Sequence, residues 1–125
     1  DTGVDSWVGC HISHNYHTGA SLYFTFGCRQ IEGREMEQYL YIKKAAEDAF
    51  MANGGTVSHH HAVGTEHLPW IEEDISPTGV KAVQALKDGL DPKGVMNPGK
   101  IIPGENPVRE WGLTDEAIQS FNKAD

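Results

Sequence analysis

The sequence predicts an α+β fold in which an antiparallel β-hairpin, or a larger sheet that contains it, is covered by helices. Two runs with alternating polarity, residues 6–14 and 20–28, flank a short loop that contains Gly19, which is typical of a hairpin. A third run, residues 35–52, places apolar side chains at helical spacing. We therefore expect this helix to cover the apolar face of the hairpin.

The two faces of the predicted hairpin differ in character. The apolar face should carry Val8, Cys10, Ile12, Leu22, Phe24, Phe26 and Cys28. The other face should carry His11, Ser13, Ser21, Tyr23 and Thr25, a set that suits either a solvated face or the wall of a site. Since Cys10 should pair near residue 25, a disulfide to Cys28 is disfavoured, and two free thiols are expected.

Helix boundaries are marked by capping residues. Glu35 and Glu37 suit the first turn of the long helix, and Gly54 suits a left-handed cap at its end. Residues 65–75 resemble a short acidic helix, after which Ser76-Pro77 should begin another helix that ends at residue 91. The remaining expectations are an irregular segment over 95–103, a loop over 104–112, and a final helix over 113–123 with Thr114 as a possible cap.

Composition excludes several classes of partner. The 125 residues carry a formal net charge of -8, without the basic stripe that nucleic acid or an anionic membrane surface requires. No apolar run approaches the length of a membrane span. The chain starts at Asp1 without a signal peptide, so we expect a processed or excised piece; no peroxisomal signal is seen at its C-terminus. The free thiols favour a cytoplasmic location, which leaves open a parent enzyme at a membrane surface.

Three consecutive histidines stand at the centre of the chain, within residues 54–64. If this stretch is extended, His59 and His61 point one way and His60 the other, so that at most two of them share a site. The residues leave three interpretations open: a metal site, acid–base chemistry beside a cofactor, or a polar loop. A zinc-binding or interaction module would use His59 and His61 with either His67 or His17.

Three stretches, residues 14–24, 54–64 and 90–100, resemble the C-terminal part of FAD-linked oxidases of the vanillyl-alcohol oxidase type. Within that group, the triple histidine and the hairpin are most similar to the alkylglycerone-phosphate synthase (alkyl-dihydroxyacetonephosphate synthase) family. The resemblance implies that residues 1–103 form part of a substrate cap, a ferredoxin-like half, followed by a return to the flavin domain. Residues 104–125 would be a C-terminal tail with a short helix.

The resemblance also implies an activity for the larger parent enzyme. This family uses FAD to exchange the acyl chain of acyl-dihydroxyacetone phosphate for a fatty alcohol in ether lipid synthesis, with no net redox change. Its catalytic residues fall on Tyr23, His59, His60 and His61, and its cofactor-binding residues on His60, His61 and Asn97. The piece alone should be inactive, and the parent could form a homodimer. The alternative is an FAD-dependent oxidoreductase that acts on a small 2-hydroxy acid or alcohol.

A metal site is not implied by this resemblance. In metal-dependent hydroxyacid dehydrogenases of the superfamily, two hairpin histidines and a Glu-His pair hold a divalent ion. Those positions fall on Tyr16, Tyr23, His60 and His61, and phenols are poor ligands beside imidazole. The chain also departs from the synthase pattern, because Ala62 stands where that pattern usually has Gly, and residues 65–67 replace its basic pair.

Overall fold

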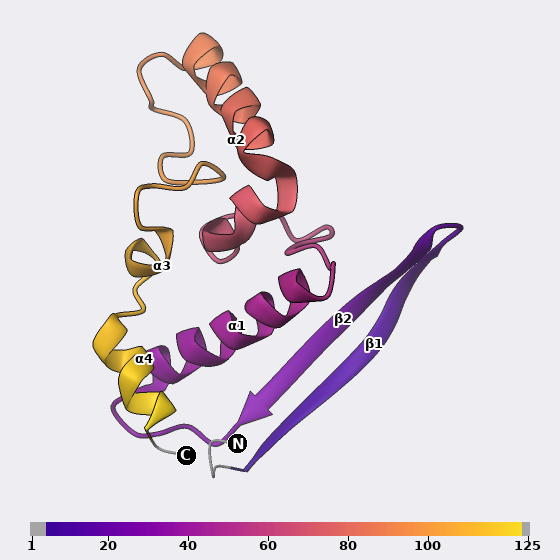
Figure 1. Ribbon diagram of the computed structural model, residues 1–125, viewed down its shortest axis with the longest axis vertical. Coiled ribbons are helices and arrows are strands. Elements are labelled where there is room, and N and C mark those ends of the chain that lie inside the picture. The colour runs from indigo at the N-terminus through magenta and orange to yellow at the C-terminus, as the bar shows by residue number, and fades with distance from the viewer. Residues whose placement is uncertain (1–4, 124–125) are drawn as a thin grey trace.

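The computed structural model describes residues 5–123 and confirms the α+β class. One two-stranded antiparallel sheet is followed by helices, and residues 5–123 contain no further strand. The elements are β1 Ser6–Tyr16, β2 Gly19–Cys28, α1 Glu35–Ala52, the 3₁₀ turn η1 Leu68–Trp70, α2 Ile71–Leu90, α3 Pro107–Glu110 and α4 Asp115–Asn122 (Figure 1). Among these described elements, no helix has both the length and the apolar character needed to cross a membrane.

The predicted hairpin is confirmed, with register close to the expected one. Its apolar residues share one face through the pairs Val8–Phe26, Cys10–Phe24 and Ile12–Leu22. Cys28 pairs instead with Ser6, at the open end of the hairpin. Both cysteines are accordingly free thiols, as expected.

A β-bulge in β1 interrupts the predicted alternation. The register shifts between Ile12 and His14, so that His14 lies opposite Ser21 and Tyr16 opposite Gly19. Because a bulge adds one residue to one strand only, the side chains beyond it change face. His14 and Tyr16 therefore lie on the face that carries Tyr23. Strict alternation fails at this point, because Ser13 has no partner on β2.

The apolar face of the hairpin is only partly covered, which corrects the expectation that it belongs to a core. Val8, Ile12 and Leu22 remain 72%, 56% and 54% exposed. Only the part of β2 beside α1 is packed, where Phe24 contacts Phe50 and Phe26 contacts Tyr39 with ring centroids 5.0 and 6.2 Å apart. The physical reason is visible in Figure 1, where the hairpin extends beyond the end of α1.

Helix α1 has the bounds that the sequence predicts. It ends through backbone hydrogen bonds from Gly54 to Met51 and from Gly55 to Phe50, with Gly54 at φ 73°. This confirms Gly54 as the left-handed cap. The buried positions of α1 are Gln38, Leu40 and Glu47. The apolar side chains at helical spacing that predicted this helix are half-buried or exposed, namely Tyr39, Ile42, Ala46, Ala49 and Phe50.

Helix α2 contains the boundary predicted at Ser76. Ser76 has non-helical backbone angles, and its hydroxyl accepts a hydrogen bond from the Gly79 N–H at 3.2 Å, which is the geometry of an N-cap. The short acidic helix expected over residues 65–75 begins later than predicted. Pro69 lies within η1, and α2 begins at Ile71 rather than at residue 65. The second half of α2 ends at Leu90, one residue before the predicted end at residue 91.

The C-terminal segment packs on α1. Leu40, Leu113 and Ala117 form a buried cluster that joins α1 to α4. The Thr114 hydroxyl accepts a hydrogen bond from the Ala117 N–H at 3.2 Å, which confirms the predicted cap. Residues 104–112, expected to be a loop, include the short helix α3. Residues 95–103 are irregular, as predicted.

Candidate functional site

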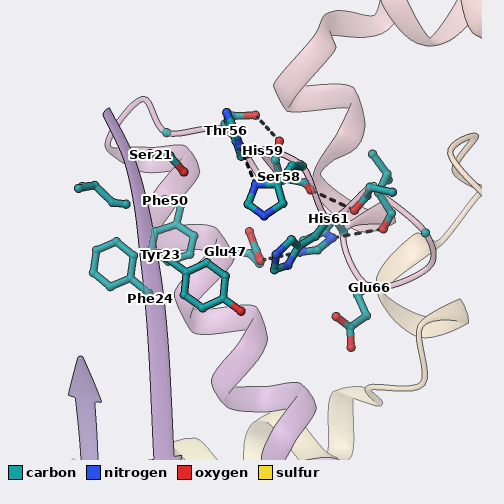
Figure 2. Close-up of a pocket in the computed structure, with 18 of the residues that line it drawn as sticks. Ser21, Tyr23, Phe24, Glu47, Phe50, Thr56, Ser58, His59, His61 and Glu66 are labelled. Atoms are coloured by element: carbon teal, nitrogen blue, oxygen red, sulfur yellow. Dashed lines mark hydrogen bonds and ion pairs between the residues drawn. The ribbon is translucent and has the colours of Figure 1, made fainter. Parts of the chain in front are cut away.

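A cavity of about 1490 Å³ lies between β2, α1 and the segment that carries the three histidines. We call residues 54–67 of that segment the histidine loop. Figure 2 shows Tyr23 on β2 facing His61, and Glu47 on α1 and His59 line the same cavity. The cavity wall is mixed, because Leu22, Phe24 and Phe50 contribute apolar surface beside these polar groups.

Three groups form a hydrogen-bonded chain across the mouth of this cavity. The Tyr16 hydroxyl lies 2.7 Å from His59 Nε2, and His59 Nδ1 lies 2.8 Å from His60 Nδ1. If Tyr16 donates, His59 carries its proton on Nδ1 and donates to His60, which then presents an N–H at Nε2. The His14 ring packs beside this chain, with its centroid 5.0 Å from His59 and 5.3 Å from His60.

The electrostatic setting of the chain favours a neutral His60. Desolvation by its neighbours, followed by the charges that His61, His59 and His14 would carry, lowers the pKa of His60 from its ordinary value. A neutral ring is required for Nδ1 to accept the hydrogen bond from His59. The arrangement therefore keeps one imidazole available as a proton acceptor or donor near neutral pH.

Tyr23 and His61 form the second part of the site. Their rings meet edge to face with centroids 5.3 Å apart, and the His61 ring also contacts His60 at 4.4 Å. Tyr23 is half-exposed and lies on the cavity wall. The structure thus brings together the four predicted catalytic residues, Tyr23 and the three consecutive histidines.

The histidine loop is bent rather than extended, so the expected alternation of its side chains is wrong. Ala62 adopts φ 67°, in the left-handed region, and its carbonyl accepts a hydrogen bond from the Ser58 hydroxyl at 3.0 Å. Buried Val57 anchors the start of the loop, and the Thr56 hydroxyl donates to Asp74 at 3.0 Å. This bend lets His59 and His60 approach each other directly.

A buried polar group lies behind the histidines. Glu47 is 1% exposed, and its Oε1 atom accepts from Lys43 Nζ at 2.7 Å and faces His67 Nε2 at 3.4 Å. His67 Nδ1 lies 3.2 Å from the Val63 carbonyl, so it donates there and leaves Nε2 to accept from Lys43 at 3.2 Å when the ring is neutral. These three residues join α1 to the end of the histidine loop.

Tyr39 is set apart from Tyr23 and the three consecutive histidines, outside the cavity lining. Its hydroxyl donates to Glu66 at 2.8 Å. Burial, together with the carboxylates of Glu66 and Glu47, raises the pKa of Tyr39 to about 12. This phenol therefore stays protonated at neutral pH, and its ring packs against Phe26.

Not every predicted site residue lines the cavity. Asn97 lies in the segment after α2 and outside the cavity lining, whereas Lys100 of the same segment lines it. The role of Asn97 toward FAD stays a prediction. Sequence reasoning missed Glu47 and Lys43, although their i, i+4 spacing on a predicted helix was a usable signal. It also missed His14, because the bulge that turns it toward the site leaves no mark in the sequence.

A different histidine set from the expected one meets the geometry of a cation site. His14, His59 and His60 each place one ring nitrogen within 4.8 Å of the others. The set expected from the sequence was His59 and His61 together with either His67 or His17. Both ring nitrogens of His59 already bond to Tyr16 and His60, so a cation would displace one of these hydrogen bonds. The absence of a metal thus stays a prediction for metal analysis to test.

Comparisons with known proteins agree on one family. Residues 2–101 match the family described as FAD linked oxidases, C-terminal domain. The chain is 35% identical over 120 residues to an alkyldihydroxyacetonephosphate synthase of Trypanosoma brucei brucei, which covers 96% of this chain and 20% of that protein. It is 42% identical over 103 residues to the synthase of the same name from Dictyostelium discoideum. This match covers 82% of this chain and 17% of that protein.

A shorter similarity extends to a protein of a different name. The glycolate oxidase subunit GlcD of Bacillus subtilis (strain 168) is 40% identical over 49 residues, which is 39% of this chain and 10% of that protein. No solved structure matches the chain. The chain spans about a fifth of the length of the two synthases.

Proposed function

The chain belongs to the FAD-linked oxidases, whose C-terminal domain it carries, and from this premise we propose that it forms part of an alkyl-dihydroxyacetonephosphate synthase. The resemblance predicted from the sequence is thereby confirmed at the level of the family. The proposed reaction exchanges the acyl chain of acyl-dihydroxyacetone phosphate for a fatty alcohol, without net redox change. The observation that carries the proposal is the contact of Tyr23 with His61 in a cavity shared by His59 and His60.

The donor set of the cavity fits a flavin ring. His60, His61 and Tyr23 are exposed there and offer N–H and O–H groups beside planar aromatic surfaces. Such groups suit the ring nitrogens and carbonyl oxygens of an isoalloxazine. When bound, FAD would supply the electron-rich centre that the exchange requires. His60 and His61 are the residues that we propose to hold it.

The chain's own residues would handle protons. Loss of a fatty acid and entry of an alcohol both require proton transfer near the substrate carbonyl, and Tyr23 is the exposed hydroxyl that we propose for this step. The neighbouring imidazole of His61 can exchange a proton with a group bound between them. The chain from Tyr16 through His59 to His60 would then keep the tautomer of His60 defined.

Substitution of Tyr23 by Phe tests this assignment in the full-length, FAD-loaded protein. We expect Tyr23→Phe to lower acyl-for-alkyl exchange by roughly 10²–10⁴-fold, the usual contribution of a positioned proton-transfer group, while the flavin spectrum is unchanged. Tyr41→Phe is the matched control, because the Tyr41 hydroxyl donates to Asn122 away from the cavity. Exchange at the normal rate in Tyr23→Phe would remove the proposed role of this phenol.

The oxidoreductase alternative is supported by the shorter similarity to glycolate oxidase GlcD. It differs from the synthase proposal in one measurable respect, since an electron acceptor is consumed only by the oxidoreductase. Anaerobic addition of acyl-dihydroxyacetone phosphate and a fatty alcohol should give ether product under the synthase proposal. Bleaching of the flavin by a 2-hydroxy acid, without ether product, would favour the alternative. A cytoplasmic location and a homodimeric parent stay predictions.

A further inference from the structure

Three imidazoles that meet beside the cavity have the composition of a transition-metal site. His14, His59 and His60 are all exposed, and each offers one ring nitrogen within 4.8 Å of those of the other two. The rings are in contact, because the His14 centroid lies 5.0 Å from that of His59 and 5.3 Å from that of His60. Imidazole nitrogen is a preferred ligand of Zn²⁺, and an ion in solution can reach an exposed cluster directly.

Two of these three rings are already oriented by a hydrogen bond at one nitrogen. Ser13 Oγ lies 3.0 Å from His14 Nδ1, and the Tyr16 hydroxyl lies 2.7 Å from His59 Nε2. When these two nitrogens carry the ring protons, His14 Nε2 and His59 Nδ1 are left with free lone pairs. Metal-binding histidines almost always donate their second N–H to such an oxygen or a carboxylate, which fixes the tautomer and the direction of the ring.

The contact between His59 and His60 supplies the third nitrogen. Their Nδ1 atoms lie 2.8 Å apart, with one proton between them. Two tetrahedral Zn–N bonds of about 2.0–2.1 Å place their nitrogens about 3.3–3.4 Å apart, so an ion can replace this proton when the pair separates by about half an ångström. His59 keeps its single proton, which moves from Nδ1 to Nε2 and is donated to Tyr16. Both rings stay neutral, and the exposed Tyr16 hydroxyl turns its own proton to water.

We infer that His14 Nε2, His59 Nδ1 and His60 Nδ1 form a binding site for Zn²⁺, with water as the fourth ligand. The ion is taken up reversibly from solution, so protein purified without added zinc is still expected to contain no metal. Only His60 is shared with the positions on which the metal ligands of the hydroxyacid dehydrogenases fall. The site itself does not depend on the proposed reaction, whereas its effect on exchange does.

Calorimetric titration of the full-length, FAD-loaded protein with ZnCl₂, after treatment with a chelator and its removal, tests the site. Relative to wild type, His14→Gln should weaken the binding of one equivalent by at least about tenfold, because loss of a ligand costs more than loss of its outer-shell partner. His17→Gln is the matched control, since His17 is an exposed histidine of the same hairpin outside the cluster. MgCl₂ should show no such equivalent, because Mg²⁺ prefers oxygen ligands. Unchanged zinc binding in His14→Gln, or an equal loss in His17→Gln, would overturn the inference.

A second variant tests the assigned ligand atoms. Tyr16→Phe removes the acceptor for His59 Nε2 but no ligand, so the equivalent should remain with an affinity about 10–100-fold lower. Tyr41→Phe, whose hydroxyl donates to Asn122, should bind as wild type does. The side chains of His14 and Tyr16 are exposed, so neither substitution removes a buried contact. An unchanged affinity in Tyr16→Phe would contradict the assignment of Nδ1 as the His59 ligand.

Exchange activity on the same preparations separates this inference from the proposed function. Zinc bound to His60 Nδ1 leaves that ring without a nitrogen that can accept a proton, so wild-type exchange should fall as the site fills. His14→Gln should require more zinc for the same inhibition. Zinc binding that depends on His14, in a protein without acyl-for-alkyl exchange, would support the site and contradict the synthase reaction. Exchange in a protein that binds no zinc would support the reaction and overturn the site.

Discussion

Ala62 holds the histidine loop in a conformation that favours glycine. Its φ is 67°, and it directly follows His61. For a residue with a Cβ atom, this left-handed conformation costs about 1–2 kcal/mol. Glycine removes that cost but loses about 0.5–1 kcal/mol more in backbone entropy on folding. The difference predicts that Ala62→Gly raises the free energy of unfolding by about 0.5–1 kcal/mol.

Two glycines of the same chain provide matched controls for this prediction. Gly64 has φ 57°, and a Cβ atom built on it would meet nothing within 4 Å. Gly64→Ala should therefore lower the free energy of unfolding by about 0.5–1 kcal/mol, the net of the backbone strain and the opposing gain in entropy. Gly19 is equally open and has no such positive φ. Gly19→Ala should stabilise by about 0.4–1 kcal/mol, which measures the entropy contribution by itself.

Urea unfolding followed by tryptophan fluorescence provides the measurement. Trp70 is buried and contacts Trp111 edge to face at 5.4 Å, so unfolding should change the emission of both rings. A loss of stability in Ala62→Gly, together with unchanged stability in Gly64→Ala, would refute the claim that backbone strain is stored in this loop.

Two further predictions concern stability elsewhere in the chain. Leu113 is 1% exposed between α1 and α4, so Leu113→Ala should cost about 2–5 kcal/mol in urea unfolding; Leu90→Ala, at an 83% exposed position, should cost almost nothing. The hydrogen bond from Lys87, aided by the N–H groups of Met96 and Val95, lowers the pKa of Asp91. Because the folded-state pKa is depressed, the carboxylate stabilises fully above its unfolded pKa of about 3.9, and the benefit disappears as the pH falls through the folded value. The stability difference between wild type and Asp91→Asn should therefore be constant at neutral pH and shrink in acid; a difference that grows below pH of about 3.9 would contradict this sign.

The elements with local signals were predictable from the sequence. Helix α1 was predicted with its observed bounds, because Glu35 and Glu37 mark its start and Gly54 its end. The caps at Ser76 and Thr114 also follow from side-chain chemistry that acts within three residues. Such features depend on neighbours in the chain, which the sequence displays directly.

The parts that depend on distant contacts were not predictable in the same way. The hairpin was expected to be covered, yet Val8 and Ile12 stay exposed, because the described helices pack only along part of β2. The pairing of Tyr23 with His61 agrees with the family resemblance rather than with any local pattern. Glu47 looked like an ordinary polar residue of a helix, because its burial arises from the histidine loop folding over α1.

The bulge in β1 makes the length of that strand as informative as its composition. One added residue between Ile12 and His14 decides that His14 and Tyr16 share a face with Tyr23. Two relatives with the same letters on either side of this point, but a one-residue gap between them, would present opposite sets of side chains to the histidine loop. When sequences of this family are aligned, a gap placed here therefore changes which residues are equivalent in space, and a high identity score across the strand would conceal that change.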